Sequence, residues 1–150
     1  MKTIWVLNGP NLNLLGSREP ELYGATTLAE IERALVEEGR RRGVAVECFQ
    51  SNGEGELVTR VQEARGRADG LIVNFGAYSH TSIALADALS AVALPAVEVH
   101  VTNVHRREPF RRRLVTAAAC VGAITGLGAR GYHLALDALC ERMAAPEVAR

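Results

Sequence analysis

The chain has 150 residues, of which 48% are hydrophobic and 23% are charged, and 17 acidic residues balance 17 basic ones. A chain of this size forms one domain with a real core, and the composition excludes a disordered protein. The absence of net charge excludes a global attraction to nucleic acid or to an acidic membrane surface. Recognition by charge must therefore be local.

Lysine and cysteine usage exclude further kinds of site. Every basic residue except Lys2 is an arginine, so a Schiff-base lysine is excluded unless Lys2 supplies it. The cysteines, Cys48, Cys120 and Cys140, are odd in number and widely spaced, which favours buried free thiols over disulfides or a zinc site. No apolar run suits a signal peptide or a membrane span, so we expect a cytoplasmic protein without a membrane partner.

Short apolar runs alternate with helical patterns along the chain. Apolar residues at helical spacing predict four helices, around residues 28–35, 57–64, 85–92 and 132–143. Two of the helix starts have the spacing of a capping box, Thr27 with Glu30 and Ser51 with Glu54. The apolar runs predict five strands, at Thr3–Leu7, Val44–Phe49, Leu71–Val73, Ala96–Val101 and Cys120–Thr125.

This alternation predicts the fold class. Nearly continuous apolar strands separated by helices are typical of a parallel sheet that helices cover on both faces. We therefore expect an α/β fold over residues 1–150, a single three-layer flavodoxin-like domain with a five-stranded parallel sheet. Such a sheet binds its ligand at the carboxyl ends of the strands, so the segments after strands one, three and four are the candidates for a site.

The segment after the first strand, residues 8–24, has the length of a lid or binding loop. It carries Arg18 and Tyr23, and Gly16 and Gly24 flank this part of it. Taken alone, a tyrosine in such a loop is more often a surface aromatic residue that caps the loop. A guanidinium within reach of the phenol favours the phenolate, however, and a loop between glycines can close both groups over a ligand.

Polar residues also follow the third strand and interrupt the fourth. Asn74 stands at the carboxyl end of the third strand, while His80 suits either a ligand contact or a solvent-facing position at a capped helix start. Glu98 and His100 share one face of the fourth strand because side chains alternate there. They form either a satisfied buried pair or a general acid whose imidazole the carboxylate orients and keeps protonated.

Arginines gather after the fourth strand, within residues 106–113. A solvated face is the default for such a run, and an aromatic content of 5% makes nucleic-acid binding a weaker alternative. We interpret one or two of these arginines as a fork for a substrate carboxylate, which indicates a small anionic ligand.

Two other patterns do not indicate a cofactor. The GxGxxG pattern at residues 126–131 comes too late in the chain for a dinucleotide site, because the acidic ribose partner would fall beyond the last residue. It favours close backbone packing. The histidines His100 and His105 have no cysteine or carboxylate cluster to complete a metal site, so no metal is expected.

Several short motifs together resemble type II 3-dehydroquinate dehydratase, in the same order and over nearly the whole chain. The resemblance implies a flavodoxin-like subunit without cofactor or metal, and a homo-oligomer, a dodecamer built as a tetramer of trimers. The motifs are Asn8-Gly9-Pro10-Asn11-Leu12, Arg18-Glu19-Pro20 with Tyr23-Gly24, Gln50-Ser51-Asn52 with Glu54-Gly55-Glu56-Leu57, Gly76-Ala77-Tyr78 with His80-Thr81-Ser82, Glu98-Val99-His100 and Gly126-Leu127-Gly128.

The resemblance also implies an activity, the dehydration of 3-dehydroquinate to 3-dehydroshikimate by anti elimination through an enolate. This reaction serves the shikimate pathway of aromatic amino acid biosynthesis or quinate breakdown. Tyr23 would be the base, Arg18 would favour its phenolate, and Asn11 would hold the water that stabilises the enolate. His100, oriented by Glu98, would protonate the departing hydroxyl. The substrate-binding residues would be Asn74, His80, Val101, Thr102, Arg107, Arg111 and, from a neighbouring subunit, Asp87.

Some positions depart from the family pattern. Thr102 stands where serine is usual, Gly53 and Phe75 stand where histidine and proline are expected, and the run at 106–113 has surplus arginines. The residue types that such an elimination needs are all present: a base, a group that stabilises the enolate, and an acid. The alternative function is a flavodoxin-like protein that binds a small anion without catalysis or with another specificity.

Overall fold

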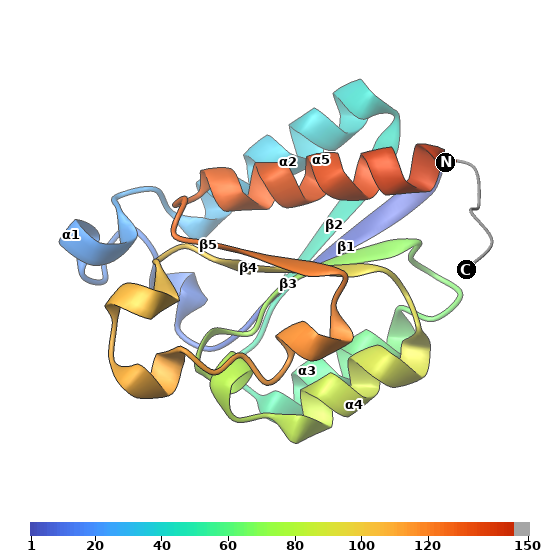
Figure 1. Ribbon diagram of the computed structural model, residues 1–150. Helices are drawn as coiled ribbons and strands as arrows, with labels where there is room; N and C mark the ends of the chain where they lie inside the picture. The colour runs from blue at the N-terminus through green and yellow to red at the C-terminus, as the bar shows by residue number, and fades with distance from the viewer. Residues whose placement is uncertain (146–150) are drawn as a thin grey trace.

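The computed structural model describes residues 1–145 as three layers, with helices on both faces of a central sheet (Figure 1). The sheet order is β2-β1-β3-β4-β5 and the paired strands run parallel. This order confirms the α/β, flavodoxin-like prediction; residues 146–150 of the expected domain lie outside the described residues. The strands are β1 (Lys2–Asn8), β2 (Val44–Gln50), β3 (Gly70–Asn74), β4 (Ala96–His100) and β5 (Gly122–Thr125).

Four long helices cover the sheet. On one face lie α2 (Leu28–Arg42) and α5 (Arg130–Ala144), and on the other lie α3 (Glu54–Glu63) and α4 (Ile83–Val92) (Figure 1). The side chains of β1 alternate between two cores. Ile4 and Val6 belong to the core under α2 and α5, whereas Trp5 and Leu7 belong to the core with α3 and α4. A strand apolar on both faces is therefore buried on both faces.

Short helical segments occupy the connections and have no counterpart in the predicted elements. A four-residue helix, α1 (Pro20–Tyr23), lies in the loop between β1 and α2. Segments this short lack the repeated apolar spacing that predicts a helix. The remaining segments are 3₁₀ turns: η1 (Leu12–Leu14), η2 (Gly76–His80), η3 (Val104–Arg106), η4 (Pro109–Arg111) and η5 (Ala117–Ala119).

The two predicted helix caps have different outcomes. At α2 the hydroxyl of Thr27 accepts the N–H of Glu30 at 3.2 Å, as predicted. At α3 the prediction is wrong, because Gly53 is the N-cap residue and no side chain caps the helix. The Ser51 hydroxyl instead accepts the N–H of Gly53 at 3.0 Å and donates to Glu56 at 2.7 Å. It closes the turn before the helix.

The GxGxxG pattern joins β5 to α5 and serves close packing, as predicted. Gly126 has a φ of +85°, in the region that favours glycine. A Cβ at Gly126 would lie 2.9 Å from the Cβ of Asn103. A Cβ at Gly131 would lie 3.2 Å from Val99, so this glycine lets α5 approach β4.

The three cysteines are free thiols, as predicted, although each is half-buried where full burial is expected. Burial raises the pKa of Cys48 and of Cys120 to about 12. A thiol that stays protonated at neutral pH is a poor nucleophile, so the chemistry of the site rests on other groups. Within residues 1–145, no helix is both long and apolar enough to cross a membrane.

Candidate active site

A pocket of about 180 Å³ opens where β1, β3 and β4 end, the edge of the sheet that the fold class predicts for a ligand. The loop after β1, η2 and the segment after β4 form its walls. Five further residues line it without having been predicted as site residues: Pro10, Leu12, Gly76 and Ala77, which belong to the quoted motifs, and Val104, which belongs to none. Ten of the predicted site residues line the pocket: Asn11, Arg18, Tyr23, Asn74, His80, His100, Val101, Thr102, Arg107 and Arg111.

Two predicted site residues lie outside the pocket. Glu98 is completely buried within β4 and contacts His100. Asp87 lies exposed on α4 and does not line this pocket within the described protomer. The structure therefore gathers all the predicted residues but Asp87 into one site.

The pocket is electropositive. Arg18, Arg107 and Arg111 line it, and within residues 1–145 no Asp or Glu does. Glu108 fixes two of these arginines from outside, because Arg111 Nε donates to its carboxylate at 2.7 Å and Arg107 Nε lies 3.8 Å from it. The described residues also contain no group of three or more His, Cys, Asp or Glu side chains that could hold a metal ion. The pocket is suited to a small anion.

Tyr23 contacts two guanidinium groups. Arg107 Nη1 donates a hydrogen bond to the phenol oxygen at 2.8 Å, and the Cζ of Arg18 lies 4.9 Å from the centroid of the ring. Two positive charges therefore lie against the tyrosine side chain. The sequence indicates Arg18 alone as the cation, since Arg107 is 84 positions away and no local spacing relates it to the tyrosine.

His100 and Glu98 meet on one face of β4, as the alternation of side chains predicts. Nε2 of His100 donates to Oε2 of Glu98 at 2.9 Å, and the other carboxylate oxygen accepts the hydroxyl of Thr116. Glu98 and Thr116 are 0% exposed and His100 is 6% exposed. Because Nε2 is hydrogen-bonded to the carboxylate of Glu98, Nδ1 is the ring nitrogen that can exchange a proton with a ligand.

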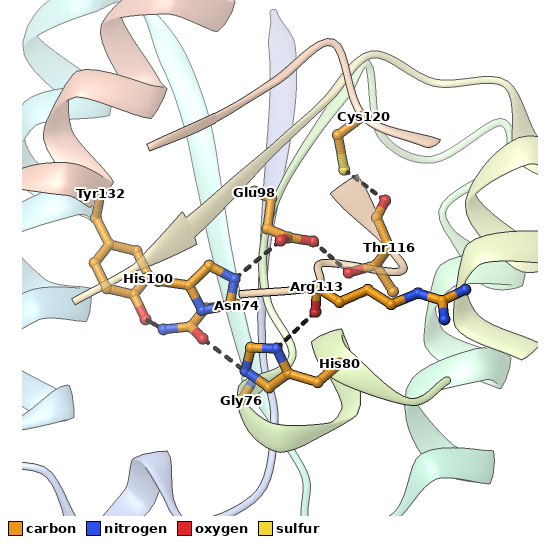
Figure 2. A network of polar contacts seen from close by, with 9 residues as sticks. All are labelled: Asn74, Gly76, His80, Glu98, His100, Arg113, Thr116, Cys120 and Tyr132. Carbon is orange, nitrogen blue, oxygen red and sulfur yellow. Dashed lines mark hydrogen bonds and ion pairs between the residues drawn. The ribbon is translucent and has the colours of Figure 1, made fainter. Parts of the chain in front are cut away.

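His80 lies beside His100, with ring centroids 5.9 Å apart and the rings stacked (Figure 2). Burial lowers the pKa of His80, and the charges of His100 and Arg111 lower it further. Nδ1 of this neutral ring donates to the carbonyl of Arg113 at 2.9 Å, so Nε2 is a hydrogen-bond acceptor.

A buried polar chain orients Asn74. Its Nδ2 donates to the Tyr132 hydroxyl at 2.9 Å, and that hydroxyl donates to Asn8 Oδ1 at 2.6 Å. Its Oδ1 accepts the N–H of Gly76 at 3.2 Å (Figure 2). Burial raises the pKa of Tyr132 well above its usual range, so the hydroxyl stays protonated. Helical spacing predicts Tyr132 only as a core residue and gives no sign of this contact.

The end of β2 fixes the start of the loop that carries Asn11. Asn11 has a φ of +68°, a conformation that asparagine tolerates better than most residues. Its backbone N–H donates to Oδ1 of Asn52 at 3.1 Å. Gln50 donates to the same oxygen and to the carbonyl of Gly9, each at 3.1 Å. The Gln50-Ser51-Asn52 motif therefore supports the site from a neighbouring strand.

The lysine of the chain lies far from this pocket along the sheet. Lys2 begins β1, and its Nζ lies 3.5 Å from Oδ1 of Asp69. The pocket lies at the opposite, carboxyl end of the same strand. The position of Lys2 therefore argues against an imine between a lysine and a ligand in the pocket.

Comparisons with known proteins agree with this site. The family model described as "Dehydroquinase class II" matches residues 2–140. A 3-dehydroquinate dehydratase of Ruegeria pomeroyi is 53% identical over 150 residues, 100% of each chain, and one of a Bradyrhizobium species is 57% identical over 145 residues, 96% of this chain and 89% of the relative. A crystal structure of type II dehydroquinase from Butyrivibrio crossotus has a TM-score of 0.90 at 43% identity, covering 92% of this chain and 97% of that chain.

Fold, pocket and comparisons define a flavodoxin-like hydro-lyase. The chain belongs to the class II dehydroquinase family. The resemblance seen in the short sequence motifs is thus confirmed.

Proposed function

We propose that this chain dehydrates 3-dehydroquinate to 3-dehydroshikimate by anti elimination through an enolate, with no covalent bond between substrate and protein. One observation carries the proposal. A tyrosine beside two guanidinium groups, Tyr23, shares an electropositive pocket with a histidine paired to a buried carboxylate, His100. Elimination next to a ketone needs a base, a group that stabilises the enolate and an acid, and the pocket offers a candidate for each.

The first step is proton abstraction by Tyr23. Its phenolate, stabilised by Arg107 and Arg18, takes the proton from the carbon next to the ketone. The electron pair of the broken C–H bond moves onto the ketone oxygen and gives the enolate. Asn11 holds the water that donates a hydrogen bond to this oxygen.

The second step is loss of the hydroxyl. The enolate re-forms the ketone, a carbon–carbon double bond forms, and the carbon–oxygen bond breaks. His100 gives a proton from Nδ1 to the departing oxygen, which leaves as water, and Glu98 stabilises the imidazolium until then. Proton exchange with water returns Tyr23 and His100 to their starting states.

The other polar residues of the pocket bind the substrate. Arg111 and the hydroxyl of Thr102 recognise the carboxylate, and the acceptor Nε2 of His80 takes a hydrogen bond from a substrate hydroxyl. Asn74, oriented by Tyr132, contacts the ring substituents. The backbone of Val101 completes the wall.

We also propose that residues 1–150 form one catalytic domain within a homo-oligomer, a dodecamer built as a tetramer of trimers. In such an assembly a neighbouring subunit would cover Ile83 on α4 and Phe110, which are 68% and 64% exposed in the single chain. A second copy over α4 would bring Asp87 toward a neighbouring site. Light scattering should give about twelve times the mass of the chain, and an active monomer would contradict the assembly.

An ultraviolet assay tests the proposed reaction. The product contains a conjugated enone and absorbs where the substrate does not, so mixing the purified chain with 3-dehydroquinate should raise the absorbance. Calorimetric binding of 3-dehydroquinate without a rise in absorbance would favour the alternative, a protein that only binds a small anion. Substrate deuterated on one face next to the ketone should lose the label only when it lies anti to the hydroxyl.

A further inference from the structure

We propose that the segment of residues 113–116, between η4 and η5, positions both histidines of the pocket, and that Thr116 acts on His100 through Glu98. This inference rests on the proposed function, in which His100 is the general acid. Thr116 is a positioning residue, since it contacts Glu98 and does not line the pocket.

The first support is the pairing of Glu98. Its carboxylate is completely buried, with Oε2 facing His100 and Oε1 accepting the Thr116 hydroxyl (Figure 2). Rotation of a carboxylate about its terminal torsion is broad and roughly two-fold. A donor on the second oxygen therefore fixes the carboxylate plane in which the first oxygen meets the imidazole.

The second support is that the same segment holds His80. The carbonyl of Arg113 accepts Nδ1 of His80 at 2.9 Å, and the N–H of Val115 donates to the carbonyl of Ser79 at 2.7 Å. Residues 113–116 thus bond to η2 through two backbone groups and to β4 through one side chain. Because His80 and His100 come from different elements, a shared support sets how one ring lies against the other.

Thr116 is itself held in place. It is 0% exposed, and its carbonyl accepts the N–H of Ala119 at 3.1 Å and the thiol of Cys120 at 3.5 Å. The hydroxyl is therefore presented to Glu98 by a fixed backbone. Glu98 can then accept hydrogen bonds from two side chains, those of Thr116 and His100. The charge of the carboxylate is shared between these two donors.

Loss of the Thr116 hydroxyl has a defined consequence. The carboxylate would keep its imidazole contact but lose the donor on Oε1, so its charge would attract the proton of the Glu98–His100 pair more strongly. The pair would then hold that proton to a higher pH and release it less readily to the leaving oxygen. The other charged or titratable groups around the pair are Tyr23, His80, Arg18, Arg107, Arg111 and, behind Glu98, Cys120.

Three variants test the inference. Thr116→Val keeps the side-chain shape without the hydroxyl, Thr116→Ser keeps the hydroxyl, and Thr59→Val makes the same chemical change on the exposed surface of α3. We expect Thr116→Val to lower kcat roughly tenfold, with KM changed less than about twofold. The part of the pH–activity profile that reflects loss of the proton from the Glu98–His100 pair should move to higher pH. Thr116→Ser should restore kcat to within about threefold of wild type, and Thr59→Val should leave kcat and the profile unchanged.

A second readout does not depend on turnover. In a histidine NMR titration, Thr116→Val should shift the titration of His100 and leave that of His133, on α5, unchanged. Unchanged kcat and unchanged titration in a folded Thr116→Val variant would overturn the inference, as would a Thr116→Ser variant as impaired as Thr116→Val.

Thr116→Cys is the replacement if Thr116→Val does not fold. Its thiol has a similar size but is a weak donor, so the variant should show the same loss of kcat, and wild-type behaviour would overturn the inference. A wild-type protein without turnover would refute the proposed function alone, and the titration would still decide the role of Thr116.

Discussion

The acid and the base of the proposed mechanism are supported in different ways. His100 belongs to β4, and its carboxylate partner is completely buried with a donor on each oxygen. Tyr23 ends the short helix α1 in the loop between β1 and α2, where it is half-buried and receives a hydrogen bond from Arg107. The sheet therefore fixes the acid, whereas arginine contacts place the base.

This difference predicts which substitutions lower activity without lowering the stability of the fold. Gly16 and Gly24 flank this part of the loop with φ values of +94° and +83°, and exposed segments with few buried contacts open most easily. Changes around Tyr23 should alter the chemistry with little loss of stability. Changes around His100 should alter both.

Tyr23→Phe should give the largest effect on catalysis. Only the ionisable oxygen is lost while the ring keeps its packing, so turnover should fall below detection, at or beyond the upper end of the ~10²–10⁴-fold range for a positioned proton-transfer group. Binding of a substrate analogue, measured by calorimetry, and the melting temperature should stay close to wild type. Substantial remaining turnover would move the search for the base to His80.

His100→Ala should lower kcat by roughly 10²–10⁴-fold while the fold persists. The melting temperature should also fall by several degrees, because Glu98 would remain buried with Thr116 as its remaining side-chain partner. Steady-state kinetics and thermal unfolding followed by circular dichroism check the two effects. Near-normal turnover would mean that the Glu98–His100 pair is only structural.

Arg18→Lys and Arg107→Lys test the role of the two guanidinium groups beside Tyr23. Each keeps a positive charge but loses the planar fork, so each should lower kcat roughly tenfold and move the rise of activity to higher pH as the phenolate is less favoured. Arg112→Lys, a change at an exposed arginine outside the pocket, is the matched control and should leave both unchanged. A pH profile identical to wild type in both pocket variants would contradict the arrangement around Tyr23.

Glu38→Gln should give the smallest effect, confined to stability. Burial opposes ionisation of Glu38, yet hydrogen bonds and charges from His133 and Arg42 together lower its pKa below the ordinary 4.5. A carboxyl group whose pKa is lower in the folded than in the unfolded state stabilises the fold at pH values above its unfolded-state pKa. This stability is lost as the pH falls through the folded-state pKa. The variant should melt about 2–4 °C lower at pH 7, match wild type in strong acid and keep its kcat. Equal melting temperatures at pH 7 would contradict a stabilising role.

The sequence predicts the parts of the site that depend on local spacing. The strand positions and the shared face of Glu98 and His100 follow from alternation within a few residues. The contacts of Arg107 with Tyr23 and of Thr116 with Glu98 join residues 84 and 18 positions apart. They depend on how loops fold back over the sheet, which no period or motif encodes. The cap at Ser51 fails for a related reason, because a hydroxyl at a turn has several competing partners.

In the proposed mechanism no covalent bond forms between substrate and protein. The most direct test adds borohydride to the purified chain during turnover of 3-dehydroquinate and then measures the intact mass and the remaining activity. With Lys2 at the far end of β1, we predict that the enone absorbance rises, the mass stays that of the unmodified chain and the activity persists. A mass increase equal to one reduced ligand, with loss of activity, would show a covalent intermediate and refute the proposed mechanism.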